Sequence, residues 1–167
     1  FFFNSIKFDL KFVFMIQRIQ SLYLFFTAIF YLNYWYFGME WFEKGFLILS
    51  DIFAHVDGKE GIFFIISYIP LFIAIVCLIS ILLFRNRVLQ YKFVIQAFRV
   101  SLFMCLFTVF YFYNTLEALI DMMPSKILEF FLYAAILNPF ICSFLIYKAL
   151  NFIKKDDELI SSLNRIR

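Results

Sequence analysis

The sequence predicts an all-α membrane protein: a four-transmembrane-helix bundle made of two helical hairpins, with both termini cytoplasmic. Of its 167 residues, 65% are hydrophobic, only 16% are charged, and 28 are Phe. A soluble domain is about half apolar and about a quarter charged, so this chain needs a bilayer as its solvent. Four Gly and three Pro are too few for a barrel with many tight turns, and they favour long helices. The length allows one domain.

Residues 1–14 are expected to be an N-terminal extension of the membrane domain. They are apolar but carry Lys7, Asp9 and Lys11, which makes them a poor spanning segment. They are either a short amphipathic helix along the membrane interface or an addition upstream of a natural start at Met15, and we favour the addition.

The first hairpin is expected to have its spans at about 19–37 and 62–84. At about 1.5 Å per residue the first span measures about 28 Å, close to the hydrocarbon thickness. The second span contains no charged residue, and Pro70 is expected to kink it. Between the spans we expect a polar loop, 38–61, on the outer side. Its short apolar patch, 46–53, should lie on the outer interface or pack over the helix ends.

A basic turn, 85–92, separates the two hairpins. The second hairpin is expected to have its spans at about 93–116 and 127–152. A polar, amphipathic tail, 154–167, then follows on the cytoplasmic side. The four-helix transmembrane domain thus covers residues 15–153.

The basic residues predict how this arrangement is threaded through the membrane. With both termini and the central turn inside, twelve of the fifteen Lys and Arg residues lie on the cytoplasmic side. Short loops rich in Lys and Arg stay in the cytoplasm, so this orientation is strongly favoured over the reverse. Arg99 enters the third span by about two turns, close enough for its side chain to snorkel to the headgroups.

Polar residues inside the spans are the first place to look for a functional site. The most informative is Asn138, because Pro139 follows it near the middle of the fourth span and leaves a carbonyl unpaired. This pair is either a substrate or ion site, or an interhelical hydrogen bond beside a packing kink, and we favour the hydrogen bond. The other candidates in or near the spans are Asn33, Gln96, Asn114 and Glu129.

The sequence does not predict an enzyme or a cofactor site. Three Cys and one His are too few for most metal or haem sites. Cys77, Cys105 and Cys142 fall at similar depths in three spans, and we interpret them as packing residues. We find no phosphate-binding loop, nucleophile elbow or metalloprotease motif. The inner basic residues are expected to contact anionic headgroups, not nucleic acid.

Three stretches resemble one family of small bacterial inner-membrane proteins, catalogued as domain of unknown function 4293. They are Met-Ile-Gln-Arg-Ile-Gln-Ser-Leu-Tyr-Leu at 15–24, Phe-Arg-Asn-Arg-Val-Leu-Gln at 84–90, and Ile-Lys-Lys-Asp-Asp-Glu-Leu at 153–159 with Asn-Arg-Ile-Arg at 164–167. The tail departs from the family pattern at Asn164, where an acidic residue is expected. The resemblance implies four spans, a start at Met15 and no assigned activity, and all three stretches lie on the cytoplasmic side.

We therefore expect a non-enzymatic accessory or scaffolding subunit of the inner membrane. Its basic cytoplasmic face would contact anionic lipid or a larger membrane protein complex. The alternative is a small oligomeric transporter or channel with its site near Asn138 and Pro139. The residues expected to contact a partner or lipid are Arg18, Arg85, Arg87, Lys92, Lys154, Lys155, Arg165 and Arg167.

The tail carries a smaller hypothesis. Asp156, Asp157 and Glu158 are expected to pair with Arg85 and Arg87 across the cytoplasmic face. An exposed pair of this kind contributes less than about 1 kcal/mol, so it would orient the tail more than stabilise the bundle.

Overall fold

The computed structural model describes residues 2–52 and 59–165, and it is helical almost throughout. It contains the α-helices α1 (Phe2–Ile52), α2 (Lys59–Leu82), α3 (Arg87–Asp121) and α4 (Lys126–Arg165), with a short 3-10 helix, η1 (Leu83–Arg85), between α2 and α3. Side chains are described for 19–39, 42–47, 61, 64–84, 86–158. The all-helical prediction is confirmed for the described residues.

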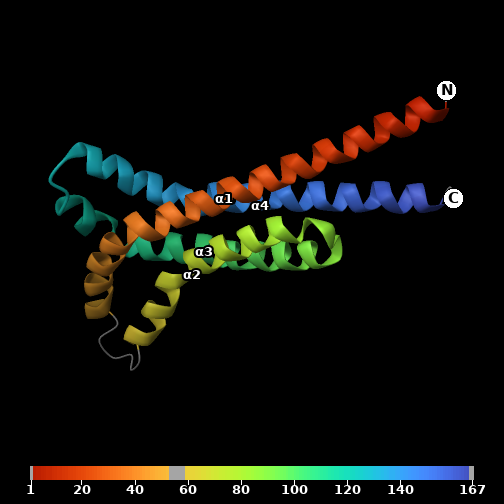
Figure 1. Cartoon of the computed structure of the whole chain (residues 1–167). Coiled ribbons are helices and arrows are strands. Elements are labelled where there is room, and N and C mark those ends of the chain that lie inside the picture. The colour runs from red at the N-terminus through yellow and green to blue at the C-terminus, as the bar shows by residue number, and fades with distance from the viewer. Residues whose placement is uncertain (1, 53–58, 166–167) are drawn as a thin grey trace.

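The helices form a bundle. α1 packs mainly against α2 and α4, and α3 packs mainly against the same two helices, so α1 and α3 lie on one diagonal, across which they also contact each other. The start of α1 and the end of α4 point towards the same end of the bundle as the α2–α3 turn, and they extend past that turn (Figure 1). The arrangement therefore has the two-hairpin connectivity expected from the sequence.

Three helices are long and apolar enough to cross a membrane. They are the part of α2 at Phe64–Leu82, α3, and the part of α4 at Lys126–Glu158. The first predicted span, 19–37, is not among them, because Gln20, Asn33 and several Tyr lower its hydropathy. That α1 also crosses the membrane is therefore a proposal.

The prediction of an outer loop at 38–61 is wrong over most of that range. α1 continues through it to Ile52, and α2 begins at Lys59. The helix continues because this part is amphipathic: Glu43 and Lys44 are exposed while Gly45 is buried. Likewise α1 runs without a break from Phe2 past the expected boundary at residue 14.

Two turns connect the helices at opposite ends of the bundle. In the basic turn, Asn86 caps α3, since its Oδ1 accepts a hydrogen bond from the Leu89 amide at 3.3 Å. In the other turn, the Leu128 amide donates to Ser125 Oγ at 3.5 Å at the start of α4. Pro70 and Pro139 lie inside α2 and α4, and both helices continue through them.

Candidate functional site

Those predicted contact residues that the structure describes lie at the end of the bundle that holds the α2–α3 turn. Lys92, Lys154 and Lys155 are exposed there, and Arg87 is partly buried. Arg167 and the side chains of Arg18, Arg85 and Arg165 lie outside the described residues. We call this end, with Arg87, Lys92, Lys154 and Lys155 as its described cations, the basic end.

At the basic end, Arg87 of α3 forms an ion pair with Asp156 of α4. The Arg87 Nη1 to Asp156 Oδ2 distance is 2.6 Å, and the two side chains are 19% and 2% exposed. The sequence predicted this pairing. It predicted an exposed pair, however, and that part of the prediction is wrong because Asp156 is buried. Because Asp156 is buried, removing its partner leaves an uncompensated charge in the interior, which costs far more than breaking a surface pair.

Two buried glutamines lie at the level of this ion pair. Gln20 of α1 is 2% exposed and Gln90 of α3 is fully buried. The Gln20 Oε1, both polar atoms of the Gln90 amide and the Asp156 Oδ1 have no hydrogen-bond partner among the described residues. Buried polar atoms of this kind are usually satisfied by ordered water.

The helix register explains why these groups meet at one level. Tyr23 of α1 stacks on Phe152 of α4 with ring centroids 5.8 Å apart. The two helices run antiparallel, so Gln20 and Asp156, each about one turn further out, lie at the same height. α1 and α4 both extend beyond the α2–α3 turn (Figure 1), and Asp156 is buried against Arg87 of α3. The interior of the basic end is therefore polar and closed, while its surface is cationic.

Further into the bundle, hydroxyl groups from three helices form one hydrogen-bonded chain. The Tyr31 hydroxyl of α1 and Ser101 Oγ of α3 are 2.7 Å apart, and Ser101 Oγ and Ser143 Oγ of α4 are 2.5 Å apart. Cys105 Sγ lies 3.2 Å from Ser143 Oγ. The sequence interpretation missed this chain. The sequence holds one partial signal, since small hydroxyl residues recur every seven positions along α3 at Ser101, Thr108 and Thr115, but only Ser101 belongs to the chain of hydroxyl groups.

Asn138 links two helices. Its Nδ2 donates to the Phe30 carbonyl of α1 at 2.9 Å, and its Oδ1 accepts from Cys142 Sγ at 3.2 Å. Both ends of the amide are thus hydrogen-bonded within the bundle, which agrees with the interpretation that Asn138 forms an interhelical hydrogen bond. Cys77, Cys105 and Cys142 are buried free thiols, as the packing interpretation expects.

Further from the basic end, α1 and α3 come into close contact. The Tyr111 hydroxyl donates to the Phe42 carbonyl at 2.6 Å. A Cβ at Gly45 would lie 2.1 Å from that hydroxyl oxygen and 2.8 Å from the Tyr111 Cζ. Only glycine lets the two helices approach this closely, so Gly45 belongs to the packing of the bundle.

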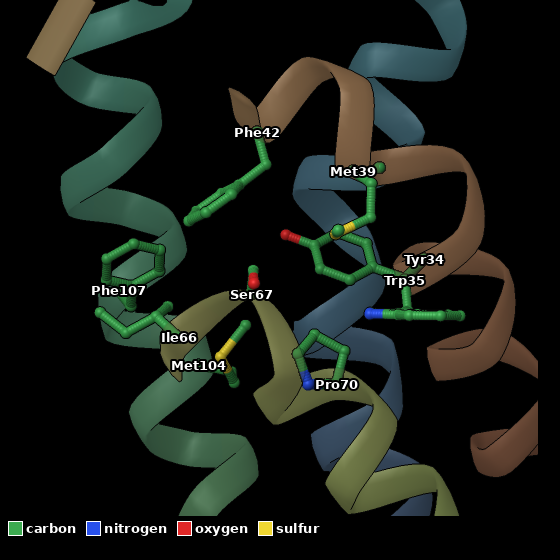
Figure 2. A pocket seen from close by; sticks show the side chains of 10 residues that line it. Tyr34, Trp35, Met39, Phe42, Ile66, Ser67, Pro70, Met104 and Phe107 are labelled. Atoms are coloured by element: carbon green, nitrogen blue, oxygen red, sulfur yellow. The ribbon is translucent and has the colours of Figure 1, made fainter. Parts of the chain in front are cut away.

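Two small cavities lie beside this contact. The larger, about 30 Å³, lies between α1, α2 and α3 (Figure 2), and its lining side chains include Trp35, Ser67 and Phe107. The second, about 20 Å³, shares Tyr34 and Phe42 with it. A ligand site usually measures about 300–1,000 Å³. Each cavity has room for a water molecule or two, and in the larger one such a water could pair with Trp35 Nε1, which has no partner among the described residues.

Among the described residues, no group of three or more His, Cys, Asp or Glu side chains could hold a metal ion. The chain does, however, match a known family model. The model is described as domain of unknown function (DUF4293), and it matches residues 16–166. The chain belongs to this family. In this DUF4293 chain the match covers all four helices and begins within α1. No curated protein and no solved structure matches the chain.

Proposed function

We propose that this DUF4293 protein is a non-enzymatic accessory or scaffolding subunit of the bacterial inner membrane. In this proposal all four helices cross the bilayer, both termini are cytoplasmic, and the basic end contacts a larger membrane protein complex or anionic lipid. The distribution of basic residues supports the orientation, since twelve of the fifteen belong to segments that this threading assigns to the cytoplasmic side.

The observation that carries the proposal is the contrast between the interior of the bundle and the surface of the basic end. In the interior, the polar groups of Tyr31, Ser101, Ser143 and Asn138 bond to neighbouring helices. The two cavities described above have room for a water molecule or two each. The basic end instead presents exposed cations. A bundle of this kind is suited to binding a partner or lipid at its cationic end.

The alternative function is a small transporter or channel with its site near Asn138. Its support is the Asn-Pro pair inside a span-length helix, a position used by substrate sites in transporters. Against it, the Asn138 amide is bonded to α1, and neither cavity is lined by Asn138 or Pro139. We therefore rank the scaffolding function first.

Co-purification tests the scaffolding function. The full chain, tagged at a terminus, is extracted from its native membrane with a mild detergent, and the bound proteins are identified. The matched control is the same chain with Lys154 and Lys155 changed to Gln, which leaves the buried Arg87–Asp156 pair intact. We expect a stoichiometric membrane protein that the control recovers less well. Recovery of no stable partner by the intact chain would count against the proposal.

A further inference from the structure

The face of α3 that points away from the core carries a polar stripe near the basic end. Lys92, Gln96 and Arg99 are all exposed, whereas Val94 and Ala97 between them are buried. At 3.6 residues per turn the three exposed side chains lie within about 60° of one another and span about 10 Å along the axis. We call these three residues the α3 stripe.

The α3 stripe lies on a helix that is otherwise suited to lipid. Beyond it, the same face continues with the exposed apolar residues Phe103 and Leu106. Cations on the lipid-facing side of a span are costly unless an anion reaches them. Between Arg87 and Leu116, α3 contains no Asp or Glu. Among the described residues, neither Lys92 nor Arg99 forms an ion pair. The compensating anion must come from outside the bundle.

The direction of the side chains indicates where that anion lies. Long side chains on a helix lean towards its N-terminus. The N-terminus of α3 is at the basic turn, so Arg99 leans back along the stripe towards Lys92 and the headgroup layer. Snorkelling over one to two turns is within the reach of Arg.

Lys148 of α4 provides a contrast at nearly the same depth. Phe98 and Tyr147 face each other with ring centroids 6.1 Å apart, which places Arg99 and Lys148 at nearly the same height. α4 runs in the opposite direction, so Lys148 leans away from the basic end. Its Nζ lies 5.2 Å from the centroid of the Phe144 ring, one turn further from that end. The chain thus holds two cations of similar depth, of which only Arg99 is directed to the headgroups.

We propose that the α3 stripe binds the headgroup of an anionic phospholipid. Arg99 and Lys92 contact its phosphate oxygens, Gln96 donates to a neighbouring ester or hydroxyl oxygen, and the acyl chains lie along Phe103 and Leu106. A second copy docked symmetrically on this face would bring its Lys92 and Arg99 against the same cations, which disfavours a dimer here. This inference rests on the proposed function and names the lipid site within it.

The test measures which lipids the purified full chain retains. The chain is placed in nanodiscs of phosphatidylglycerol and phosphatidylcholine in equal amounts, released into detergent, and analysed by native mass spectrometry. One cation near a membrane surface contributes about 1 kcal/mol, so Arg99→Ala should lower the ratio of retained phosphatidylglycerol to phosphatidylcholine about fivefold. Lys92→Ala should act similarly, and Arg99→Lys should keep most of the preference.

The matched control is Lys148→Ala, which removes one cation of similar depth and should leave the ratio unchanged. Helix content and elution volume of each variant check that the bundle remains folded. Equal losses in Lys148→Ala and Arg99→Ala would overturn the site in favour of a general charge effect. If Arg99→Ala loses a co-purifying protein while keeping its lipid, the face binds a partner helix instead.

Two further results separate this inference from the function it rests on. If the wild-type chain prefers phosphatidylglycerol and the Lys92→Ala/Arg99→Ala double variant keeps that preference, the α3 stripe is not the site, and the lipid-binding basic end stands. If the wild-type chain shows no preference at all, the lipid role of the basic end fails together with the site.

Discussion

Asparagine in place of Asp156 should destabilise the bundle far more than the same change at its neighbour. Asp156→Asn removes the negative charge that Arg87 meets at 2.6 Å, while keeping the shape of the side chain. Loss of one partner from a fully buried ion pair costs about 3–5 kcal/mol. Since Arg87 keeps 19% of its side chain exposed and can rehydrate in part, we expect about 2–3 kcal/mol.

The assay is reversible unfolding in mixed micelles at increasing SDS, followed by helix content. Asp157→Asn is the matched control, because it makes the same chemical change at the next residue, which is exposed. It should change the free energy of unfolding by less than about 0.5 kcal/mol. The exchanged pair, Arg87→Asp with Asp156→Arg, should recover part of the lost stability. Equal effects of Asp156→Asn and Asp157→Asn would refute the reasoning from burial.

Three further predictions address the interior. Gly45→Ala should cost about 1–2 kcal/mol in the same assay, because its Cβ would force the Tyr111 ring away from Phe42, whereas Gly38→Ala, with nothing within 4 Å, should be neutral or stabilising. Ser101→Ala should cost about 1–2 kcal/mol by breaking the hydroxyl chain, and Ser67→Ala, which removes a hydroxyl that bonds to the Phe64 carbonyl of its own helix, should cost less than about 0.5 kcal/mol; similar values for both would argue against a stabilising hydroxyl chain. Asn138→Ala should lower stability by about 0.6–1.7 kcal/mol, more than Asn114→Ala, whose amide bonds within α3. If the chain supports any solute flux in liposomes, Asn138→Ala should leave the flux unchanged; its loss would favour the transporter function.

The sequence predicted the helical class, because the length of the hydrophobic runs and the scarcity of Gly and Pro are local properties. It failed at 38–61, where charged residues suggested a loop. Whether Glu43 and Lys44 belong to a loop or to the exposed face of a helix depends on what covers the other face. Here α3 covers the other face of α1, through the contact of Tyr111 with Phe42 and Gly45.

The ion pair at the basic end was predictable in its partners but not in its energy. The run from Lys154 to Glu158 is charged throughout and has the composition of a solvated tail. Asp156 nevertheless continues the buried face of α4, seven residues after Ala149 and three after Ile153. Its burial depends on the packing of α1 and α3 against this part of α4, a tertiary feature that no local pattern contains. The hydroxyl chain likewise depends on the register of three helices.

Site-specific photo-cross-linking tests the central claim most directly. A photoreactive amino acid replaces Asp157, which is exposed at the basic end, or Met122, which is 60% exposed in the turn at the opposite end. After irradiation in intact cells, the scaffolding function predicts a discrete protein adduct from position 157 and none from position 122. Adducts only from position 122, or none from either position, would contradict a role for the basic end in holding a partner.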